Sequence, residues 1–483
     1  MSRRRALILL SAAVLFWLCR RAYFVGFFND DAYYLIGAKS LLSGRYAEIH
    51  SPGAPPIVTF FPGWPLLLAP VLALTGGSVA AAQFWALALL IAGLAFFAFA
   101  LERESGAETS DLALACAAAS PLLTSTAATL LADGPMLFCA GAALAALPRL
   151  WRSRESSVWL FFGAALGLAS LVRPTGPTLP LAFAAVLLLD GRRREAAVLL
   201  GSAAAVFAAW LVRGFVVSGA GWSHWREATS AARAAGIPFL SNAWGCVDSI
   251  FARSLLRPPV PGAFLEWCSV LAGFGLASFG ARRLRTPSGR AAALFLAFFI
   301  LPHLLSAKTA ARYFIPVIPV AAWLLLRGAG FLSLRAARAV AALSLILSSL
   351  ASVGVLRAST SLSTEITRPP KAAAWLKAQA PRGAVLAAEY DGRWHLLTGL
   401  PALHIPYDVR TSEALSRFLE VSGVSFVVVE DTSLALRPAG GDYVVPSGEA
   451  LRALLQATMK FHRVFADDSG RAEVWAFSAR PRR

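Results

Sequence analysis

Charged residues are scarce in this chain of 483 residues. Asp, Glu, Lys and Arg make up 15% of the sequence, and the hydrophobic fraction is 57%. Soluble domains typically contain about 25% charged residues. So much apolar side chain excludes an intrinsically disordered protein. A soluble globule of this size could not bury all of it, so we expect part of the chain to face lipid.

Cysteine is also scarce. The five cysteines form no CxxC pair and keep no regular spacing, so we expect neither a disulfide framework nor a cysteine-based zinc site. No GxGxxG or P-loop sequence opens a predicted helix of the C-terminal portion. The sequence also lacks an internal repeat of solenoid period. These absences argue against a nucleotide-binding or repeat fold.

The charge that is present is mostly basic. The chain has 45 Lys and Arg against 27 Asp and Glu, a net charge of +18. In a soluble protein this excess would indicate nucleic-acid binding. Here much of the Arg lies in short clusters between apolar runs, a pattern typical of membrane topology. We therefore expect a lipid bilayer, and no nucleic acid, as a partner. The clusters lie at 3–5, 149–154, 192–194, 282–290 and 327–338.

The apolar runs predict a polytopic α-helical membrane protein with about eleven spans. The first run, residues 6–28, follows three Arg and has no clear cleavage site, so we interpret it as a retained span. If every basic cluster is cytoplasmic, an even number of crossings separates successive clusters. This makes the Pro-rich run 60–76 an outer re-entrant or juxtamembrane element. The other runs lie near 79–101, 110–128, 133–148, 157–172, 175–189, 196–213, 263–280, 291–305, 313–326 and 339–356.

This layout predicts two domains. Residues 1–357 form a membrane domain with a cytoplasmic N-terminus and with outer loops at 29–78 and 214–262. Residues 358–483 form a small outward-facing α/β domain, because helical and strand patterns alternate there. The expected helices are 372–381, 412–423 and 448–458, and the expected strands are 384–390, 424–431 and 472–477.

Two adjacent carboxylates, Asp30 and Asp31, open the first outer loop at the start of a predicted helix. Asn29 is the expected N-cap, and Gly44 is the expected end of the helix. The helix dipole favours the ionised form of both acids, which a general base needs at neutral pH. Acids are also common at helix N-termini for structural reasons alone, and the pair does not decide between the two interpretations.

Four other charged residues, Asp133, Arg173, Lys308 and Arg312, lie at the outer ends of predicted spans. Charges at membrane depth are costly and tend to line cavities, although a single one could be a snorkelling side chain. Acids combined with Arg and Lys fit a site that activates a hydroxyl and holds a phosphate.

These residues carry a resemblance to the bacterial membrane glycosyltransferases of the GT-C superfamily, in the style of protein O-mannosyltransferases and the lipid A aminoarabinose transferase. The family's acidic pair, aromatic residue and A-x-x-L-x-x-G-x-Y stretch appear as DDAYYLIGAKSLLSGRY, and a Pro-rich apolar segment follows. The sequence departs from the pattern at Asp31, where many relatives have Glu, and at Leu400, where the tail usually has Arg. The other matches are Asp133 and Pro135 in an Asp-x-Pro motif, Arg173 between two short spans, and Arg312, Tyr313, Pro316 and Pro319 in R-Y-x-x-P-x-x-P.

The resemblance implies an inverting glycosyltransferase of the bacterial inner membrane. Its donor would be a polyprenyl-phosphate-linked sugar, and its acceptor a hydroxyl of a lipid, glycan or protein on the outer side. Inversion fits a single base, since retention through a glycosyl-enzyme requires a second carboxylate as nucleophile. No metal or other cofactor is implied. The implied roles are general base for Asp30, support for Asp31, assistance for Asp133, and donor-phosphate binding for Arg173, Lys308, Arg312 and Tyr313.

A transporter or flippase is the main alternative, because about eleven spans with charges at membrane depth would suit it. It predicts inverted repeats and helices broken at the midplane, whereas the charges here gather at one face. A polymerase or ligase of lipid-linked glycans and a non-enzymatic assembly scaffold are further alternatives. His50 and His224 could bind a metal, but we interpret both as solvated loop residues.

Overall fold

The computed structural model of the chain divides into two compact units, and each is described by itself. Unit 1 contains Met1–Arg21 and Val58–Thr360, and unit 2 contains Ala22–Ile57 and Ser361–Arg483. The residues that the structure describes are 2–19, 25–26, 28–127, 129–218, 239–258, 262–305, 310–366, 370–406, 409, 411–430, 448–467 and 472–477, with the side chains of 355–366 excepted.

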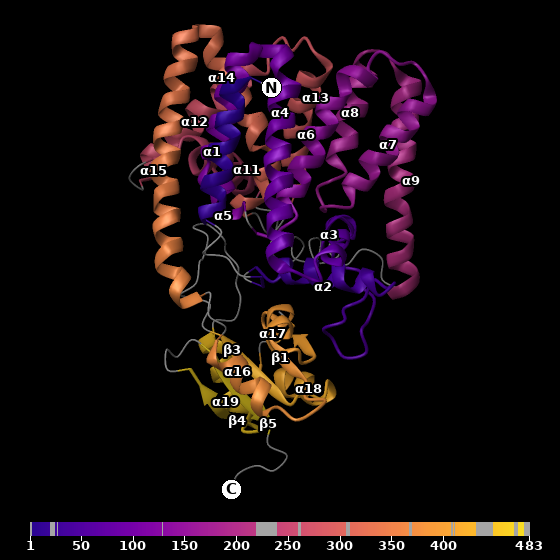
Figure 1. Ribbon diagram of the computed structural model, residues 1–483, viewed down its shortest axis with the longest axis vertical. Helices are drawn as coiled ribbons and strands as arrows, with labels where there is room; N and C mark the ends of the chain where they lie inside the picture. The colour runs from indigo at the N-terminus through magenta and orange to yellow at the C-terminus, as the bar shows by residue number, and fades with distance from the viewer. Residues whose placement is uncertain are drawn as a thin grey trace. The chain divides into compact units, whose positions relative to one another are not determined.

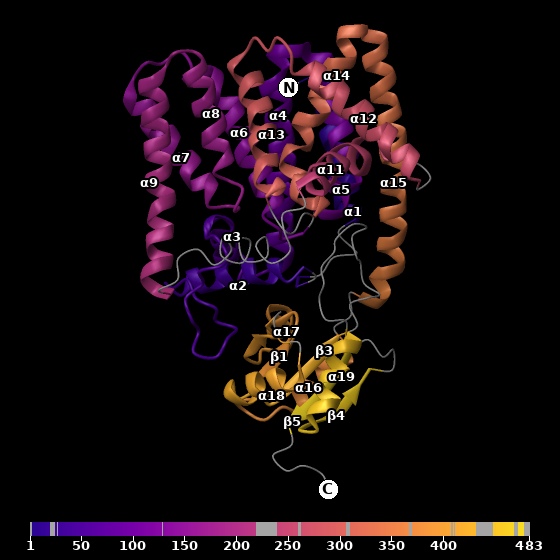
Figure 2. The same ribbon diagram turned by 180° about the vertical axis from the view of Figure 1, so that it is seen from behind.

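Helices are the only regular secondary-structure elements in the described residues of unit 1. Its long helices run roughly parallel, and α9 and α15 lie at opposite edges of the bundle (Figure 1, Figure 2). The helices are α1 (Arg3–Cys19), α3 (Gly63–Leu74), α4 (Val79–Ala119), α5 (Pro121–Thr126), α6 (Asp133–Leu150), α7 (Ser156–Ser170), α8 (Thr178–Leu189), α9 (Arg193–Ser218), α11 (Phe239–Ile250), the π-helix η2 (Phe251–Leu255), α12 (Ala263–Gly280), α13 (Pro287–Leu304), the 3₁₀-helix η3 (Ala311–Val317), α14 (Ile318–Leu332) and α15 (Leu334–Ile366).

Within the described residues, six helices are long and apolar enough to cross a membrane. The expectation of a mostly helical, multi-pass membrane protein with a small sheet domain is thereby confirmed, whereas the count of about eleven spans stays a prediction. Three shorter apolar helices, α3, α7 and α8, fall below the length of a standard span. The six helical segments are Val79–Ala119, Arg193–Ser218, Ala263–Gly280, Pro287–Leu304, Ala311–Leu332 and Leu334–Gly354.

Helix α4 differs from the two separate runs expected over 79–101 and 110–128. The polar segment between the two runs is also helical, except at Gly106, whose φ of 81° and ψ of 163° form a kink. The second run contains the end of α4 and all of α5. Glycine tolerates this backbone conformation because it has no Cβ, so the chain bends at Gly106 without a long loop.

Close helix packing in unit 1 depends on small residues. Helix α4 packs against α6 and α14, and α7 packs against α9. A Cβ on Gly141 of α6 would lie 2.6 Å from the carbonyl oxygen of Gly93 on α4. Only glycine permits this approach, as is usual where membrane helices meet.

Unit 2 contains a five-stranded mixed sheet of order β2-β1-β3-β5-β4. Strand β1 is parallel to β2 and β3, whereas β5 is antiparallel to β3 and β4. Its described elements are α2 (Asp30–Leu42), α16 (Lys371–Gln379), β1 (Leu386–Ala388), α17 (Asp391–Thr398), β2 (Ala402–His404), α18 (Ser412–Val421), β3 (Phe426–Glu430), α19 (Gly448–Thr458), β4 (Phe461–Ala466) and β5 (Ala472–Phe477).

Helices cover both faces of this sheet. On one face Ala387, Val427 and Val429 pack with apolar residues of α18 and α19. On the other face Leu386 and Val428 pack with residues of α16 and with Trp394 of α17. The alternation follows the two-residue period of a strand. All three helices and three strands that the sequence predicted here are confirmed, and α17, β2 and β4 are additional.

Candidate active site

The first candidate residues lie at the start of α2 in unit 2. Asp31 is fully buried, and its carboxylate accepts hydrogen bonds from the backbone N–H groups of Gly26 (2.8 Å) and Phe28 (3.2 Å). Asp30 is partly exposed. The two adjacent acids therefore have different environments: Asp31 fixes the turn before the helix, and Asp30 has access to solvent.

The turn before α2 has an unusual backbone. Gly26 has φ 96°, and a Cβ added there would lie 2.5 Å from the Cβ of Arg393 on α17. Asn29 occupies the N-cap position of α2, as expected, but it has φ 60° and ψ −47° and its side chain makes no capping hydrogen bond. Positive φ is uncommon outside glycine, and Asn tolerates it better than most residues. The Asn29 side chain bonds elsewhere in unit 2, to Asp391.

Asp391, at the first position of α17, is the centre of a buried polar network that the sequence did not reveal. Its Oδ2 accepts a hydrogen bond from the Tyr33 hydroxyl (2.8 Å), and its Oδ1 accepts one from Asn29 Nδ2 (3.3 Å). His50 Nε2 lies 3.1 Å from Oδ2, and His404 Nδ1 lies 3.9 Å from Oδ1. Burial by itself raises the pKa of Asp391, but the hydrogen bonds and the nearby imidazoles outweigh it and hold that pKa below its ordinary value.

The interpretation of His50 as a solvated loop residue is wrong. Its side chain is fully buried and lies edge-on to the Tyr33 ring at a centroid distance of 4.8 Å. The reason is its pairing with Asp391 and the hydrogen bond that its carbonyl oxygen accepts from the Ala402 N–H (2.7 Å). His224 lies outside the described residues. In the part of the chain that the structure describes, His, Cys, Asp and Glu form no group of three that could hold a metal.

Two glutamates lie near this network. Glu430, at the end of β3, pairs with Arg393 of α17. Glu389 is largely buried, and burial, with the negative charge of Glu430 as a second cause, raises its pKa to about 8. Glu389 is therefore mostly protonated at neutral pH.

The second group of candidate residues lies in unit 1, at the ends of four helical elements. Asp133 begins α6, Arg173 lies in the turn between α7 and α8, and Arg312 and Tyr313 lie in η3. Arg173 pairs with the Asp133 carboxylate and donates a second hydrogen bond to the Tyr313 carbonyl oxygen (3.2 Å). Asp133, Arg173 and Arg312 are all buried. The structure thus brings together four residues that are far apart in the sequence.

Aromatic rings complete this cluster. The Arg173 and Arg312 guanidinium carbons lie 5.1 and 5.4 Å from the centre of the Tyr313 ring, at cation–π distance. His303, near the end of α13, stacks on the same ring at 5.7 Å and is 5% exposed. The sequence analysis missed His303. Its only signal was a polar ring on an otherwise apolar span, ten residues before Tyr313. Lys308 lies outside the described residues.

The local sequence explains why these charges meet. Pro174, Gly176 and Pro177 shape the short turn that follows Arg173, and the Thr178 hydroxyl donates to the Thr175 carbonyl within it. Pro316 permits a 3₁₀ segment at Ala311–Val317 before α14 starts. The two buried guanidinium groups offer the planar sets of charged N–H donors that suit an anion such as a phosphate.

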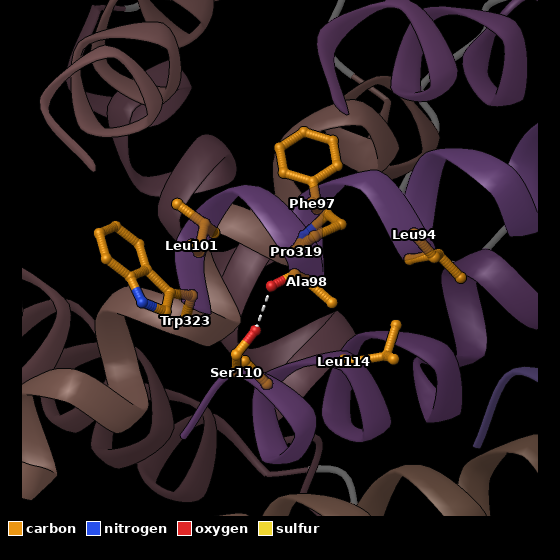
Figure 3. A pocket seen from close by; sticks show the side chains of 9 residues that line it. Leu94, Phe97, Ala98, Leu101, Ser110, Leu114, Pro319 and Trp323 are labelled. Atoms are coloured by element: carbon orange, nitrogen blue, oxygen red, sulfur yellow. Dashed lines mark hydrogen bonds between the residues drawn. The ribbon is translucent and has the colours of Figure 1, made fainter. Parts of the chain in front are cut away.

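Unit 1 also contains a small cavity between α4 and α14, close to the kink at Gly106. It holds about 10 Å³, room for at most one water molecule. Its lining is apolar apart from Ser110, whose hydroxyl donates to the Ala98 carbonyl oxygen (Figure 3). Too small for a sugar or a phosphate, it is a packing defect at the bend.

Comparison with known proteins identifies the fold. The family model "Dolichyl-phosphate-mannose-protein mannosyltransferase" matches residues 55–217. None of the curated proteins matches the sequence. Among solved structures, ArnT from Cupriavidus metallidurans bound to undecaprenyl phosphate matches with a TM-score of 0.61 and 16% identity, over 98% of both chains. The oligosaccharyltransferase AglB from Archaeoglobus fulgidus, in complex with an inhibitory peptide and a dolichol-phosphate, matches with a TM-score of 0.56 and 12% identity, over 98% of this chain and 74% of that one.

The chain has the GT-C glycosyltransferase fold. The resemblance read from its motifs is therefore confirmed. The family-model match ends at residue 217 and includes Asp133 and Arg173. The two structural matches cover 98% of this chain, including its C-terminal α/β portion.

Proposed function

We propose that this chain is an inverting glycosyltransferase that moves a sugar from a polyprenyl-phosphate carrier to an acceptor hydroxyl on the outer side of the bacterial inner membrane. The observation that carries the proposal is the buried cluster of Arg173, Arg312, Tyr313 and Asp133 in a chain with this fold. The related ArnT structure contains undecaprenyl phosphate, and the AglB structure a dolichol-phosphate. A carrier phosphate is the ligand whose charge fits this cluster.

The proposed step balances as a single displacement. The acceptor oxygen attacks the anomeric carbon, the bond from that carbon to the phosphate oxygen breaks, and the phosphate leaves with the electron pair. Asp30 takes the hydroxyl proton as general base, and Asp31 holds the turn that precedes it. Arg173, Arg312 and Lys308 neutralise the charge that develops on the leaving phosphate. Attack from the opposite side of the ring inverts the anomeric configuration.

The arrangement in the membrane is part of the proposal. Residues 1–357 would form the transmembrane catalytic domain, and residues 358–483 an α/β domain outside the cytoplasm. In the structure, residues 22–57 group with the C-terminal residues in unit 2.

The test uses the purified full chain in lipid nanodiscs. A panel of undecaprenyl-phosphate-linked hexoses and pentoses serves as donor, with lipid A, a Ser/Thr-rich peptide and a cell-wall polysaccharide as acceptors. We expect release of undecaprenyl phosphate and a glycosylated product with inverted configuration from at least one combination. Binding of undecaprenyl phosphate should be much tighter than binding of undecaprenol, which lacks the phosphate. Equal binding of the two lipids without any transfer would overturn the proposal, and movement of the lipid between leaflets without transfer would favour a flippase.

A further inference from the structure

The buried carboxylate of Asp391, on helix α17, forms hydrogen bonds with residues that flank Asp30 in the sequence. Asp391 is 1% exposed and accepts hydrogen bonds from the side chains of Asn29 and Tyr33. Asn29 is the residue directly before Asp30, and Tyr33 follows it by three positions, about one helical turn later. The Asp391 side chain is therefore hydrogen-bonded to residues on each side of the proposed base.

The same carboxylate is itself held from several directions. His50 and His404 approach it at 3.1 and 3.9 Å, and His404 Nδ1 also lies 2.9 Å from the Glu389 carbonyl oxygen. The Tyr33 and His50 rings are in edge contact at 4.8 Å. Because each of these groups contacts another member of the network, Asp391 has little freedom to move.

The turn before Asp30 depends on these contacts. Asn29 has a positive φ, which L-residues adopt at a cost, and its side chain bonds to Asp391 instead of capping α2. Gly26 packs directly against Arg393, two residues beyond Asp391. The conformation of this turn is therefore set by α17 and not by the local sequence alone.

We infer that Asp391 is a positioning residue of the proposed enzyme, holding Asn29 and Tyr33 so that Asp30 keeps the orientation that proton abstraction requires. The inference rests on the proposed function, and Asp391 acts through its neighbours without touching the reacting atoms. It gives the C-terminal α/β portion a role in turnover beyond its own folding. A displacement of a catalytic group by about 1 Å can cost about 10²-fold in rate.

The first experiment needs no substrate. Hydrogen–deuterium exchange of the full chain in nanodiscs is compared for wild type, Asp391→Asn, Tyr33→Phe and the control Glu413→Gln, whose side chain lies on the exposed part of α18 in the same unit. We expect at least tenfold faster exchange at residues 30–34 in Asp391→Asn, a smaller increase in Tyr33→Phe, and none in the control. Unchanged exchange at the start of α2 in Asp391→Asn would overturn the inference whether or not the chain transfers sugar.

The second experiment measures turnover per folded molecule with the donor found active for wild type. Asp391→Asn should lower kcat by about 10²-fold while the KM for the donor and the affinity for undecaprenyl phosphate stay within twofold. Asn29→Ala should add little further loss in an Asp391→Ala background, because both changes remove the hydrogen bond between Asn29 and Asp391. Asp391→Glu, which keeps the charge, should recover part of kcat. A merely structural role would lower the folded fraction and leave kcat per folded molecule unchanged, which would sink the inference. Absence of transfer by wild type would instead count against the proposed function.

Discussion

Arg173 pairs with Asp133 in the buried part of unit 1, although forty positions separate them in the sequence. The same guanidinium donates to the Tyr313 carbonyl, so the pair links the start of α6 to the turn after α7 and to η3. Asp133 compensates the charge of Arg173, and Arg312 adds a second buried guanidinium group to the cluster. The pair therefore holds the guanidinium of Arg173 in place beside Tyr313.

Removal of the acid from this pair should destabilise the protein strongly. Asp133→Ala leaves a buried guanidinium without its carboxylate, for which we expect a loss of about 3–5 kcal/mol in the free energy of unfolding. The matched control is Asp190→Ala, which breaks a more exposed pair with Arg290 and should cost about 0–1 kcal/mol. Thermal unfolding in detergent compares the two variants. Equal shifts in melting temperature would contradict the assignment of Asp133 to a buried pair.

Arg312 should govern use of the donor more than use of the acceptor. Arg312→Ala removes a charged guanidinium group that can donate hydrogen bonds. We therefore expect undecaprenyl phosphate to bind about tenfold to a hundredfold more weakly, with binding of undecaprenol unchanged. Arg312→Lys should restore only part of the affinity, because Lys lacks the planar fork of donors. Arg338→Ala, which changes an exposed pair with Glu108, is the control. Wild-type affinity for undecaprenyl phosphate in Arg312→Ala would remove this residue from the phosphate site.

Much of the fold was accessible from the sequence because its signals are local. Apolar runs predicted the helical membrane part, and the alternating patterns of residues 372–477 predicted three helices and three strands of the small sheet domain. Helix α17 was missed because its eight residues, DGRWHLLT, show no clear amphipathic period. Strand β2 has only three residues, too few for a strand pattern. Such short elements are fixed by their neighbours in the fold.

The candidate site likewise contains residues that the sequence predicted and residues that it did not. Arg173, Arg312 and Asp133 could be singled out because charges at membrane depth are rare in any sequence. The network around Asp391 could not, because its hydrogen bonds join residues 341 to 362 positions apart. His50 lies in the segment EIHSPGAPP, whose Pro and Gly indicate an exposed loop. Its burial depends on α17, which the sequence analysis did not predict.

The two adjacent acids of α2 should respond differently to loss of charge. Asp30→Asn should lower kcat by about 10²–10⁴-fold with an unchanged melting temperature, because a general base is lost and the partly exposed side chain keeps its shape. Asp31→Asn should lower stability by about 1–3 kcal/mol, because the buried carboxylate accepts hydrogen bonds from two backbone N–H groups. Sugar transfer and thermal unfolding are measured on both variants. If Asp31→Asn alone abolishes transfer at unchanged stability, the two roles are reversed.

Gly26 should be intolerant of any side chain. Gly26→Ala combines a positive φ with an added Cβ 2.5 Å from that of Arg393, so we expect a loss of about 2–5 kcal/mol from backbone strain and overpacking together. Gly44→Ala is the control: its φ is also positive, at 74°, but no heavy atom lies within 4 Å of the added Cβ. That variant should lose only about 1–2 kcal/mol. Limited proteolysis of the full chain near residues 22–57 reports the difference, and equal protease sensitivity of the two variants would contradict the close packing of Gly26 on α17.

Glu389 should make the stability of unit 2 fall as the pH rises. Burial and the charge of Glu430 raise its pKa from 4.5 to about 8, so the folded state holds a proton that the unfolded state has already released. Its stabilising contribution is fully present below pH 4.5 and is lost as the pH rises through 8. We expect the melting temperature of unit 2 to decrease between pH 6 and 9. Tryptophan fluorescence measures it, because Trp394 and Trp475 are buried in this unit. Glu389→Gln, which mimics the protonated form, should flatten this dependence and raise stability at pH 9, whereas the control Glu413→Gln should keep the wild-type slope. An unchanged slope in Glu389→Gln would show that another group accounts for the dependence.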